Sequence, residues 1–431
     1  MSARPVVRAV VVNHNSGPLV ARAVRSLLAL DWPADRLDVV VIDNASTDDG
    51  LDELPEDSRL TLVRNDHNLG FGAAVNQGRT HAGRRPDAVL LLNPDAWIEP
   101  DALDRLTSWL AAEARVGAVA PRIVFDRPMA EVVVTTDRQV QARLIDARVD
   151  GEPVFDSVHA LAGADRRPRR DGTSPWLLDH EATFHLPHGR TATFTMTARR
   201  AGEISLRSGD AEVEVTVAAE PTTVTLDLAE PPLTVIQNDG SWVARDGTGH
   251  NRHFHARTDA VGDDSCDVFA WCGAAVVLRT DMLDQLGGFA DDFFLYYEDT
   301  DLSWRGRAGG WRHVVEPAAV VHHRHSASTG QGQAVTEINQ HRNRVLMVMR
   351  NGTLIDAVAA VVGLAGTAVS AVARAVGDRL SGGPGDLTRA RWRWRSLAGV
   401  LAALPRTLGQ RRALARTAHR ARRDVAAELG G

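Results

Sequence analysis

An aspartate that ends an apolar run is the first feature of the sequence that suggests chemistry. In Leu90-Leu91-Leu92-Asn93-Pro94-Asp95, the leucines predict a buried strand, and Asp95 follows it within three residues. Ligands of open α/β sheets bind beyond the carboxyl ends of the strands, so an acid placed there can meet a metal ion or a phosphate. The alternative is a proline turn with a solvated carboxylate.

Polar residues also follow the other strands expected in the N-terminal region. Asn13 follows the first strand, Asp43 and Asn44 follow the second, and Asn65 follows the third. We expect these strand ends to converge on one rim of the sheet together with Asp95. Short acids and amides at such a rim either cap the next helix or hold a base or a ribose.

A glycine-containing segment, Asn68-Leu69-Gly70-Phe71-Gly72, precedes a helix that is expected to include Asn76. Its glycines stand where the backbone would approach a ligand closely. The N-terminus of the helix favours anions, including a diphosphate. A plain glycine-rich turn explains the segment equally well.

Three acids within four residues, Glu298, Asp299 and Asp301, follow a run of aromatic side chains. Aromatic residues shield a carboxylate from water, and neighbouring acids raise its pKa. This arrangement suits a general base. An acidic helix start that serves only as a cap is the alternative.

Short β-rich runs alternate with helical patterns over the first 127 residues, which predicts parallel βαβ units and an α/β fold. The expected strands are 6–12, 38–42, 60–64 and 88–92, and the expected helices are 19–30 and 71–80. From 129 to 232 an alternation with a period of two, punctuated by prolines, predicts an inserted antiparallel β-sandwich domain. These patterns divide the chain into four parts, which are 1–128, 129–232, 233–331 and a helical region 332–431.

The C-terminal region is predicted to be helical and basic. The segment 354–376 is apolar but rich in Ala, Gly and Val, so we expect a packed or interfacial helix and not a membrane span. From Arg389 onward there are eleven arginines against Asp424 and Glu428, and Trp392 and Trp394 lie among them. Basic residues with interfacial tryptophans predict peripheral contact with the inner membrane surface. A solvated helix that packs on the catalytic domain is the alternative.

Composition narrows the class of protein. The chain has 431 residues, a formal net charge of −6 and two cysteines, Cys266 and Cys272, in no disulfide or zinc spacing. We expect no nucleic-acid partner. Polar residues interrupt the apolar N-terminus too early for a secretory signal, so a cytoplasmic location is expected.

In their order along the chain, the four motifs resemble those of family 2 glycosyltransferases with the GT-A fold, and most resemble the rhamnosyltransferase-like subgroup. The resemblance covers about residues 5–127 and 234–350. It implies that 1–128 is the nucleotide-sugar-binding half of a GT-A Rossmann-like mixed sheet and that 233–331 is the acceptor and catalytic half. The resemblance implies no role for the β insertion, which could bind acceptor, organise a homo-oligomer, contact a partner or act as a spacer.

The resemblance also implies roles for individual residues. Asp299 matches the catalytic base, and Asp95 matches the last acid of the DxD metal motif, here Asn93-Pro94-Asp95. Because Asn93 replaces the first acid, we expect a weakly held Mg²⁺ or Mn²⁺ that diphosphate oxygens complete. His323 resembles a late histidine that joins the metal or diphosphate site, although two neighbouring histidines leave this assignment open by one position. Donor-binding residues are expected to be Asn13, Asp43, Asn44, Asn68, Gly70, Asn76, Asn93 and Asp95, and Glu298, Asp301 and Trp271 are expected on the acceptor side.

The implied activity is that of an inverting glycosyltransferase, a hexosyltransferase of the EC 2.4 class. The donor would be a nucleotide diphosphate sugar, dTDP-rhamnose or a UDP-sugar, and the acceptor would be a hydroxyl of a lipid-linked or polymeric cell-envelope glycan. Two alternatives remain open from the sequence. One is a catalytically silent glycan-binding scaffold, and the other is a sugar-nucleotide nucleotidyltransferase.

Overall fold

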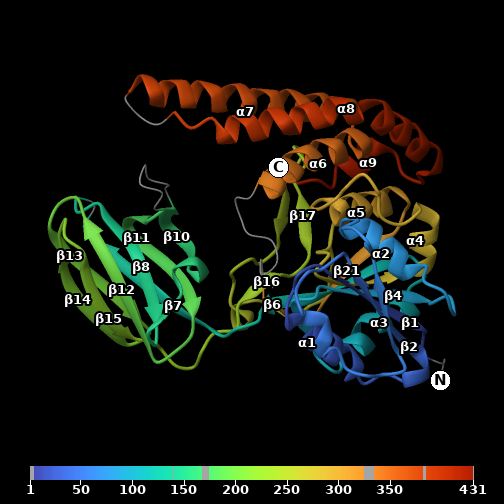
Figure 1. Cartoon of the computed structure of the whole chain (residues 1–431), viewed down its shortest axis with the longest axis horizontal. Coiled ribbons are helices and arrows are strands. Elements are labelled where there is room, and N and C mark those ends of the chain that lie inside the picture. The colour runs from blue at the N-terminus through green and yellow to red at the C-terminus, as the bar shows by residue number, and fades with distance from the viewer. Residues whose placement is uncertain (1–3, 138, 167–173, 325–333, 382–384, 431) are drawn as a thin grey trace. The chain divides into compact units, whose positions relative to one another are not determined.

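The computed structural model describes residues 4–137, 139–166, 174–324, 334–381 and 385–430 (Figure 1). The chain folds as two compact units. Unit 1 consists of Met1–Val124, Gln237–Phe254 and Asp263–Gly431, and unit 2 consists of Phe125–Ile236 and His255–Gly262. Along the sequence, the second unit therefore interrupts the first.

Unit 1 is built on one mixed sheet, to which the described residues contribute ten strands in the order β19-β21-β6-β20-β4-β1-β2-β3, with β16 beside β6 and β5 beside β21. Strands β4, β1, β2 and β3 run parallel, whereas β20 is antiparallel to β4. The prediction of an α/β fold is confirmed. The strands are β1 (Val7–Asn13), β2 (Leu37–Asp43), β3 (Leu60–Arg64), β4 (Ala88–Leu92), β5 (Ala96–Ile98), β6 (Val116–Phe125), β16 (Ile236–Asn238), β19 (Cys266–Asp267), β20 (Ala275–Arg279) and β21 (Arg312–His323).

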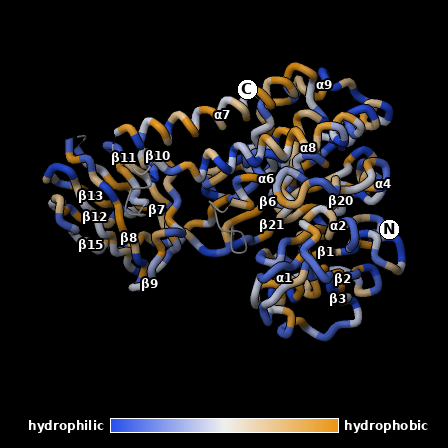
Figure 2. Tube along the Cα trace, turned by 45° about the horizontal axis from the view of Figure 1, so that its top comes forward, coloured by the Kyte–Doolittle hydropathy of each residue, from blue (hydrophilic) through white to orange (hydrophobic). Residues whose placement is uncertain are grey.

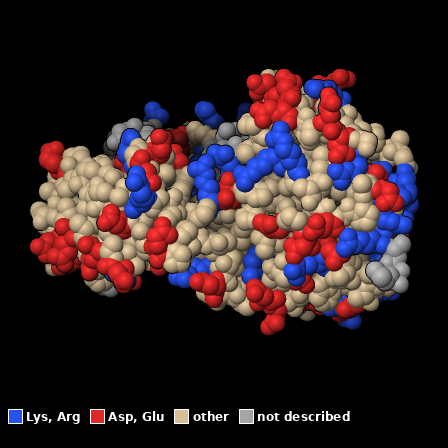
Figure 3. Space-filling view, turned by 90° about the horizontal axis from the view of Figure 1, so that it is seen from below, with Lys and Arg blue, Asp and Glu red and all other residues tan. Residues whose placement is uncertain are grey.

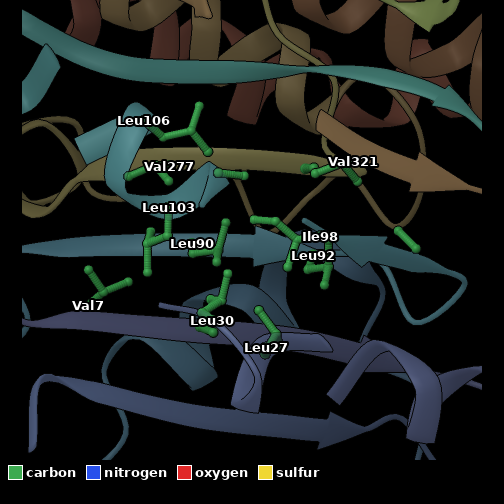
Figure 4. Close-up of a cluster of buried hydrophobic side chains, with 14 of the residues drawn as sticks. Val7, Leu27, Leu30, Leu90, Leu92, Ile98, Leu103, Leu106, Val277 and Val321 are labelled. Carbon is green, nitrogen blue, oxygen red and sulfur yellow. The ribbon is translucent and has the colours of Figure 1, made fainter. Parts of the chain in front are cut away.

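Both faces of this sheet are buried, which explains why its strands are almost continuously apolar. In β1, Val7 and Val11 enter one hydrophobic core, and Val10 enters the other. Figure 4 shows the first core, in which Leu27 and Leu106 pack on the strands. Helices α1 (Leu19–Leu28) and α3 (Ala102–Ala112) cover this first face, and α2 (Phe71–Arg79), α4 (Thr280–Leu286) and α5 (Glu298–Ala308) contribute to the second core.

The predicted elements of this region agree closely with the observed ones. The strands expected at 60–64 and 88–92 have those bounds, and the other two begin or end within one residue of expectation. The helix expected at 19–30 ends two residues earlier, at Leu28. The carboxyl ends of β1, β2 and β4 carry the polar residues that the sequence places there.

Unit 2 is antiparallel, but it is not a sandwich of two separate sheets. The described residues form one nine-stranded sheet in the order β14-β13-β7-β11-β8-β12-β15, with β10 beside β11 and β9 beside β8, and its inner face encloses one hydrophobic core. The long strand β11 pairs with β7 over Glu181–Pro187 and with β8 at Trp176 and Leu177, so it joins the two halves. The strands are β7 (Met129–Thr136), β8 (Ala142–Val149), β9 (Glu152–Pro153), β10 (His159–Arg166), β11 (Trp176–Pro187), β12 (Thr191–Ala198), β13 (Gly202–Ser208), β14 (Ala211–Val217) and β15 (Thr222–Asp227).

Unit 1 also contains the short hairpin β17 (Ser241–Val243) and β18 (Gly249–Asn251) and the predicted C-terminal helices. The helices are α6 (Ala334–Asn351), α7 (Leu354–Leu380), α8 (Thr388–Thr417) and α9 (Arg422–Ala426). A capping box between Thr353 and Asp356 fixes the start of α7. The length of 27 residues and the composition of α7 would allow it to cross a membrane, but one side of the helix is buried, so the expected packed or interfacial helix stays a prediction.

Candidate active site

A cavity of 310 Å³ lies at the carboxyl ends of the central strands of unit 1. Its walls come from segments far apart in the sequence. The lining residues are Val12, His14, Ser16, Asn44, Asn68, Gly70, Phe71, Asn93, Pro94, Asp95, Cys272, Gly273, Ala274, Phe294, Leu295, Tyr296, Glu298, Asp299 and His323. The cavity therefore collects most of the candidate residues identified from the sequence, and it adds several that were not.

The ends of β1 and β2 form one side of the site. Asn13 and Asp43 are paired across the strands, and the Asn13 amide donates to the Asp43 carboxylate at 3.1 Å and to the Ser46 hydroxyl at 2.9 Å. Both residues are buried behind the cavity wall, whereas Asn44 lines the cavity and donates to the Gly70 carbonyl at 3.3 Å. Asn13 and Asp43 thus support the loop that presents Asn44.

The glycine segment forms the next wall. Gly70 has a φ of 83°, and a Cβ there would lie 2.4 Å from the Phe294 carbonyl oxygen, so only glycine fits. The Asn68 side chain accepts from the Gly70 amide at 2.8 Å. Asn76 does not line the cavity. Its side chain donates to the Phe289 carbonyl at 2.8 Å and accepts from the Phe289 amide at 3.0 Å, so it fastens the segment that precedes the acids.

Asp95 and His323 meet on the opposite wall. The Nε2 atom of His323 lies 3.1 Å from the Asp95 carboxylate and 3.4 Å from the Asn93 amide, and its Nδ1 atom lies 2.6 Å from Gln237 Oε1. His322 points away, because its Nε2 bonds Glu99 at 2.8 Å. Antiparallel pairing of β21 with β5 sets this alternation.

Of the three neighbouring histidines, His323 is therefore the one that the structure brings to Asp95, and His325 lies outside the described residues. Sequence reasoning missed Gln237, which fixes the His323 ring from a strand 86 positions away in the sequence. No local pattern around that glutamine signals this contact.

Glu298 and Asp299 enter the cavity at the start of α5. The two residues before them, Tyr296 and Tyr297, have φ values of 71° and 69°, a left-handed turn that is costly for tyrosine. The Asp299 carboxylate accepts from the Gly273 amide at 2.9 Å, from the Thr300 amide at 2.6 Å and from the Thr300 hydroxyl at 3.0 Å. Its orientation is therefore fixed by three donors.

Burial governs the electrostatics of these acids. It raises the pKa of Asp299, although the Gly273 and Thr300 hydrogen bonds oppose that rise. Burial and the neighbouring Asp299 raise the pKa of Glu298 to about 8, and its Oε2 atom has no hydrogen-bond partner among the described residues. The Cys272 thiol has its pKa raised to about 12 by burial and by Asp299. Glu298 and Asp299, two carboxyl groups with raised pKa values, therefore lie side by side on one wall of the cavity.

Two residues expected on the acceptor side lie elsewhere. Asp301 is fully buried, accepts from Arg305 Nε at 2.8 Å and Asn351 Nδ2 at 2.8 Å, and lies 3.1 Å from Arg350 Nη1. Burial alone would raise its pKa, but these arginines hold it below its usual range. Trp271 is 1% exposed and packs edge-on against Phe289 in the second core of unit 1. Neither residue lines the cavity.

The protein's own ligands for a cation would be few. Across the described ranges, no group of three or more His, Cys, Asp or Glu side chains is placed to hold a metal ion. Asp95 and His323, at 3.1 Å, offer a carboxylate oxygen and an imidazole nitrogen on the cavity wall. These two donors fit a divalent cation that takes its remaining ligands from a bound diphosphate or water.

Comparisons with known proteins show what this chain is similar to. Residues 9–172 match the model of Glycosyl transferase family 2. The chain is 24% identical over 357 residues to N-acetylglucosaminyl-diphospho-decaprenol L-rhamnosyltransferase of Mycobacterium tuberculosis, in strains CDC 1551 and H37Rv, covering 80% of this chain and 84% of the relative.

Among solved structures, GalNAc-T7 with UDP, GalNAc and Mn²⁺ aligns at a TM-score of 0.47 and 12% identity, over 81% of this chain and 48% of that chain. The mannosyltransferase PcManGT from Pyrobaculum calidifontis, with GDP-Man and Mn²⁺, aligns at a TM-score of 0.40 and 17% identity, over 94% of this chain and 88% of that chain. The family match over residues 9–172 and the rhamnosyltransferase relative confirm the resemblance stated from the sequence, and they support glycosyltransferase activity for this chain.

Proposed function

We propose that this protein transfers a sugar, with inversion at the anomeric carbon, from a nucleotide diphosphate sugar to a hydroxyl of a lipid-linked or polymeric glycan. One observation carries the proposal. A single cavity joins a rigidly held, basic carboxylate, Asp299, to the Asp95–His323 pair on another wall. A single displacement needs a base for the acceptor and a stabilised leaving group for the donor, and the two walls offer these.

In the proposed reaction, the acceptor oxygen attacks the anomeric carbon while its proton passes to the Asp299 carboxylate. The bond between that carbon and the diphosphate oxygen breaks, and the nucleoside diphosphate leaves with the electron pair. The raised pKa of Asp299 makes its carboxylate a stronger base, and the three donors on that carboxylate fix its orientation. Asp95 and His323 would hold a Mg²⁺ or Mn²⁺, which when bound neutralises charge on the leaving diphosphate.

The remaining cavity residues suit donor binding. Asn44, Asn68 and Asn93 present amides, and Gly70 lines the same cavity. We assign nucleotide-sugar binding to residues 1–128 and acceptor binding and catalysis to 233–331. We assign to Glu298, whose buried Oε2 has no hydrogen-bond partner among the described residues, a contact with the acceptor hydroxyl.

The relative's name suggests the chemical class of both substrates. That protein is an L-rhamnosyltransferase acting on N-acetylglucosaminyl-diphospho-decaprenol. We therefore propose dTDP-rhamnose or a UDP-sugar as donor and a lipid-linked cell-envelope glycan as acceptor. We also propose that the enzyme works at the cytoplasmic face of the membrane, where a lipid-linked acceptor would be within reach.

The test is a panel of nucleotide sugars incubated with the full chain and Mg²⁺ or Mn²⁺. We expect one donor to raise the melting temperature and to release its nucleoside diphosphate in the presence of a diphosphate-lipid glycan acceptor. Binding of no nucleotide sugar would overturn the proposal in favour of a silent scaffold. Release of inorganic pyrophosphate from a sugar phosphate and a nucleoside triphosphate would favour a nucleotidyltransferase.

A further inference from the structure

Helix α7 has two apolar faces, and the described part of the protein covers only one of them. Ala360, Leu364 and Ala368 on the covered face are buried, and α7 packs there against α6 and α8. Side chains mostly spaced three, four or seven residues apart occupy the other face, as expected for one side of a helix. These exposed residues are Leu354, Ile355, Val358, Val362, Val369, Val376 and Leu380.

The exposed face is long and free of charge. Ile355 is 81% exposed, Val362 63% and Leu380 85%. No charged residue occurs between Asp356 and Arg374. At a rise of about 1.5 Å per residue, the face extends for roughly 39 Å, far more than a scatter of single surface hydrophobics. Figure 2 shows α7 in orange and pale colours along most of its length.

Positive charge gathers at one end of this face. Arg374 and Arg379 are exposed on α7, and Arg389, Arg391 and Arg395 are exposed at the start of α8. Helix α8 begins eight positions after α7 ends and packs against it, so these arginines lie along the same helix pair (Figure 1). Trp394, 47% exposed, lies among them. Arginines and a half-exposed tryptophan beside an apolar stripe fit the headgroup region of an anionic bilayer.

The other occupants of such a face fit less well. Two copies of the chain meeting through parallel α7 helices would bring their arginines towards one another, and like charges oppose that contact. A span across the bilayer would pull α7 away from the core that it shares with α6 and α8, exposing Leu364 and its neighbours. A helix that lies flat on the bilayer can keep one apolar face packed in the protein while its other apolar face contacts lipid.

We propose that the exposed face of α7 lies flat on an anionic lipid bilayer, with the arginines between 374 and 395 contacting lipid phosphates. This docking rests on the proposed function only in its purpose, which is to bring the cavity to a lipid-linked acceptor. The face itself is independent of the cavity chemistry.

The experiment measures co-sedimentation of the full-length protein with vesicles of phosphatidylcholine and phosphatidylglycerol, compared with phosphatidylcholine alone. We expect salt-sensitive binding to the anionic vesicles and release by an alkaline carbonate wash. In the triple variant V358E/V362E/V369E the bound fraction should fall by about tenfold or more, because carboxylates on this face would have to be desolvated. The matched control S58E/T61E/A111E adds the same charge at exposed positions outside α7 and should bind like the wild type.

Circular dichroism checks that both variants fold, and nucleotide-sugar hydrolysis by each reports on the cavity. Unchanged vesicle binding by the α7 variant overturns the docking face, and retention of the wild type after the carbonate wash overturns it in favour of a span. A dimer that the α7 variant dissociates, with no vesicle binding by the wild type, overturns it in favour of a second copy. Vesicle binding without activity on any donor would instead overturn the proposed function and leave the docking face standing.

Discussion

At the residue scale, Asp299 combines deep burial with a carboxylate held by the Gly273 and Thr300 donors, so its position hardly depends on substrate. Replacing it by Asn keeps the shape but removes the base. We expect Asp299→Asn to lower kcat by about 100- to 10,000-fold while the donor dissociation constant changes little. Steady-state transfer assays and donor titration measure the two quantities. The exposed Asp52→Asn serves as control, and near-normal turnover of Asp299→Asn would remove this residue from the mechanism.

The two adjacent histidines of β21 offer a matched pair for the cation. His323 lies 3.1 Å from Asp95, whereas His322 bonds Glu99 and stacks on Trp97. We expect His323→Ala to raise the Mn²⁺ concentration for half-maximal activity by about tenfold or more, and His322→Ala to change it far less. Equal effects of the two substitutions on the metal titration would contradict the assignment.

Glu298 makes stability depend on pH. Its pKa rises from an ordinary 4.5 to about 8 on folding, so above pH 4.5 the folded state holds a proton that the unfolded state releases. Its contribution to stability is therefore full below 4.5 and is lost as the pH rises towards 8. As the pH rises from 4.5 to about 8, we expect the free energy of unfolding to fall less for Glu298→Gln than for the wild type. Urea unfolding across the range measures this, and parallel pH profiles would contradict it.

Residue patterns predict the acids but not which way they face. Asp299 and Asp301 stand two positions apart on α5, and on a helix such residues point to nearly opposite sides. One therefore enters the cavity while the other meets Arg305 and Arg350 inside the protein. Asp95 was predictable because a strand end fixes its surroundings locally. Gln237 was not predictable, since only the tertiary fold brings it to His323.

At the element scale, α6 braces the strained turn that precedes Glu298 and Asp299. The buried Asn343 amide donates to the carbonyls of Leu295 at 2.9 Å and Tyr296 at 3.0 Å. Asn343→Ala leaves both carbonyls short of a donor and should cost about 1–3 kcal/mol of stability. Because the left-handed turn then relaxes, kcat should fall while the donor dissociation constant stays nearly constant. Urea unfolding and kinetics of this variant, beside Asn339→Ala on the same helix, measure both effects, and an unchanged kcat would contradict the bracing role.

Element types followed well from the sequence, but their pairing did not. Alternation with a period of two identified the strands of unit 2, yet it is silent on which strands pair. A long strand that changes partners from β7 to β8 converts the expected two sheets into one. The helices of the C-terminal region were likewise predictable from pattern, whereas the covered side of α7 depends on its packing with α6 and α8.

At the scale of the whole molecule, charge is distributed unevenly along the chain. The overall formal charge is −6, although the segment after Arg389 is strongly basic. On the face drawn in Figure 3, acidic and basic side chains are interspersed. The C-terminal arginines are a local excess of positive charge in an acidic chain, which suits an anionic surface.

Unit 2 can be tested as a separable part, because every residue that lines the cavity belongs to unit 1. The chain enters and leaves the β insertion side by side, with Met129 and Leu233 exchanging two backbone hydrogen bonds of 2.8 Å. Replacing residues 130–232 by a short glycine turn should therefore preserve the donor-induced rise in melting temperature. A variant that folds by circular dichroism but binds no donor would contradict this independence.

The same deletion discriminates among roles for the insertion. If unit 2 only spaces or assembles the enzyme, transfer to short and to long acceptor glycans should change by the same factor. If it binds glycan, transfer to long acceptors should fall further, because only these reach beyond the cavity. A role of unit 2 in dimerisation is tested by light scattering of the deletion variant and of the wild type. That role predicts that the deletion lowers the molecular mass in solution, while the ratio of transfer to long and to short acceptors stays unchanged.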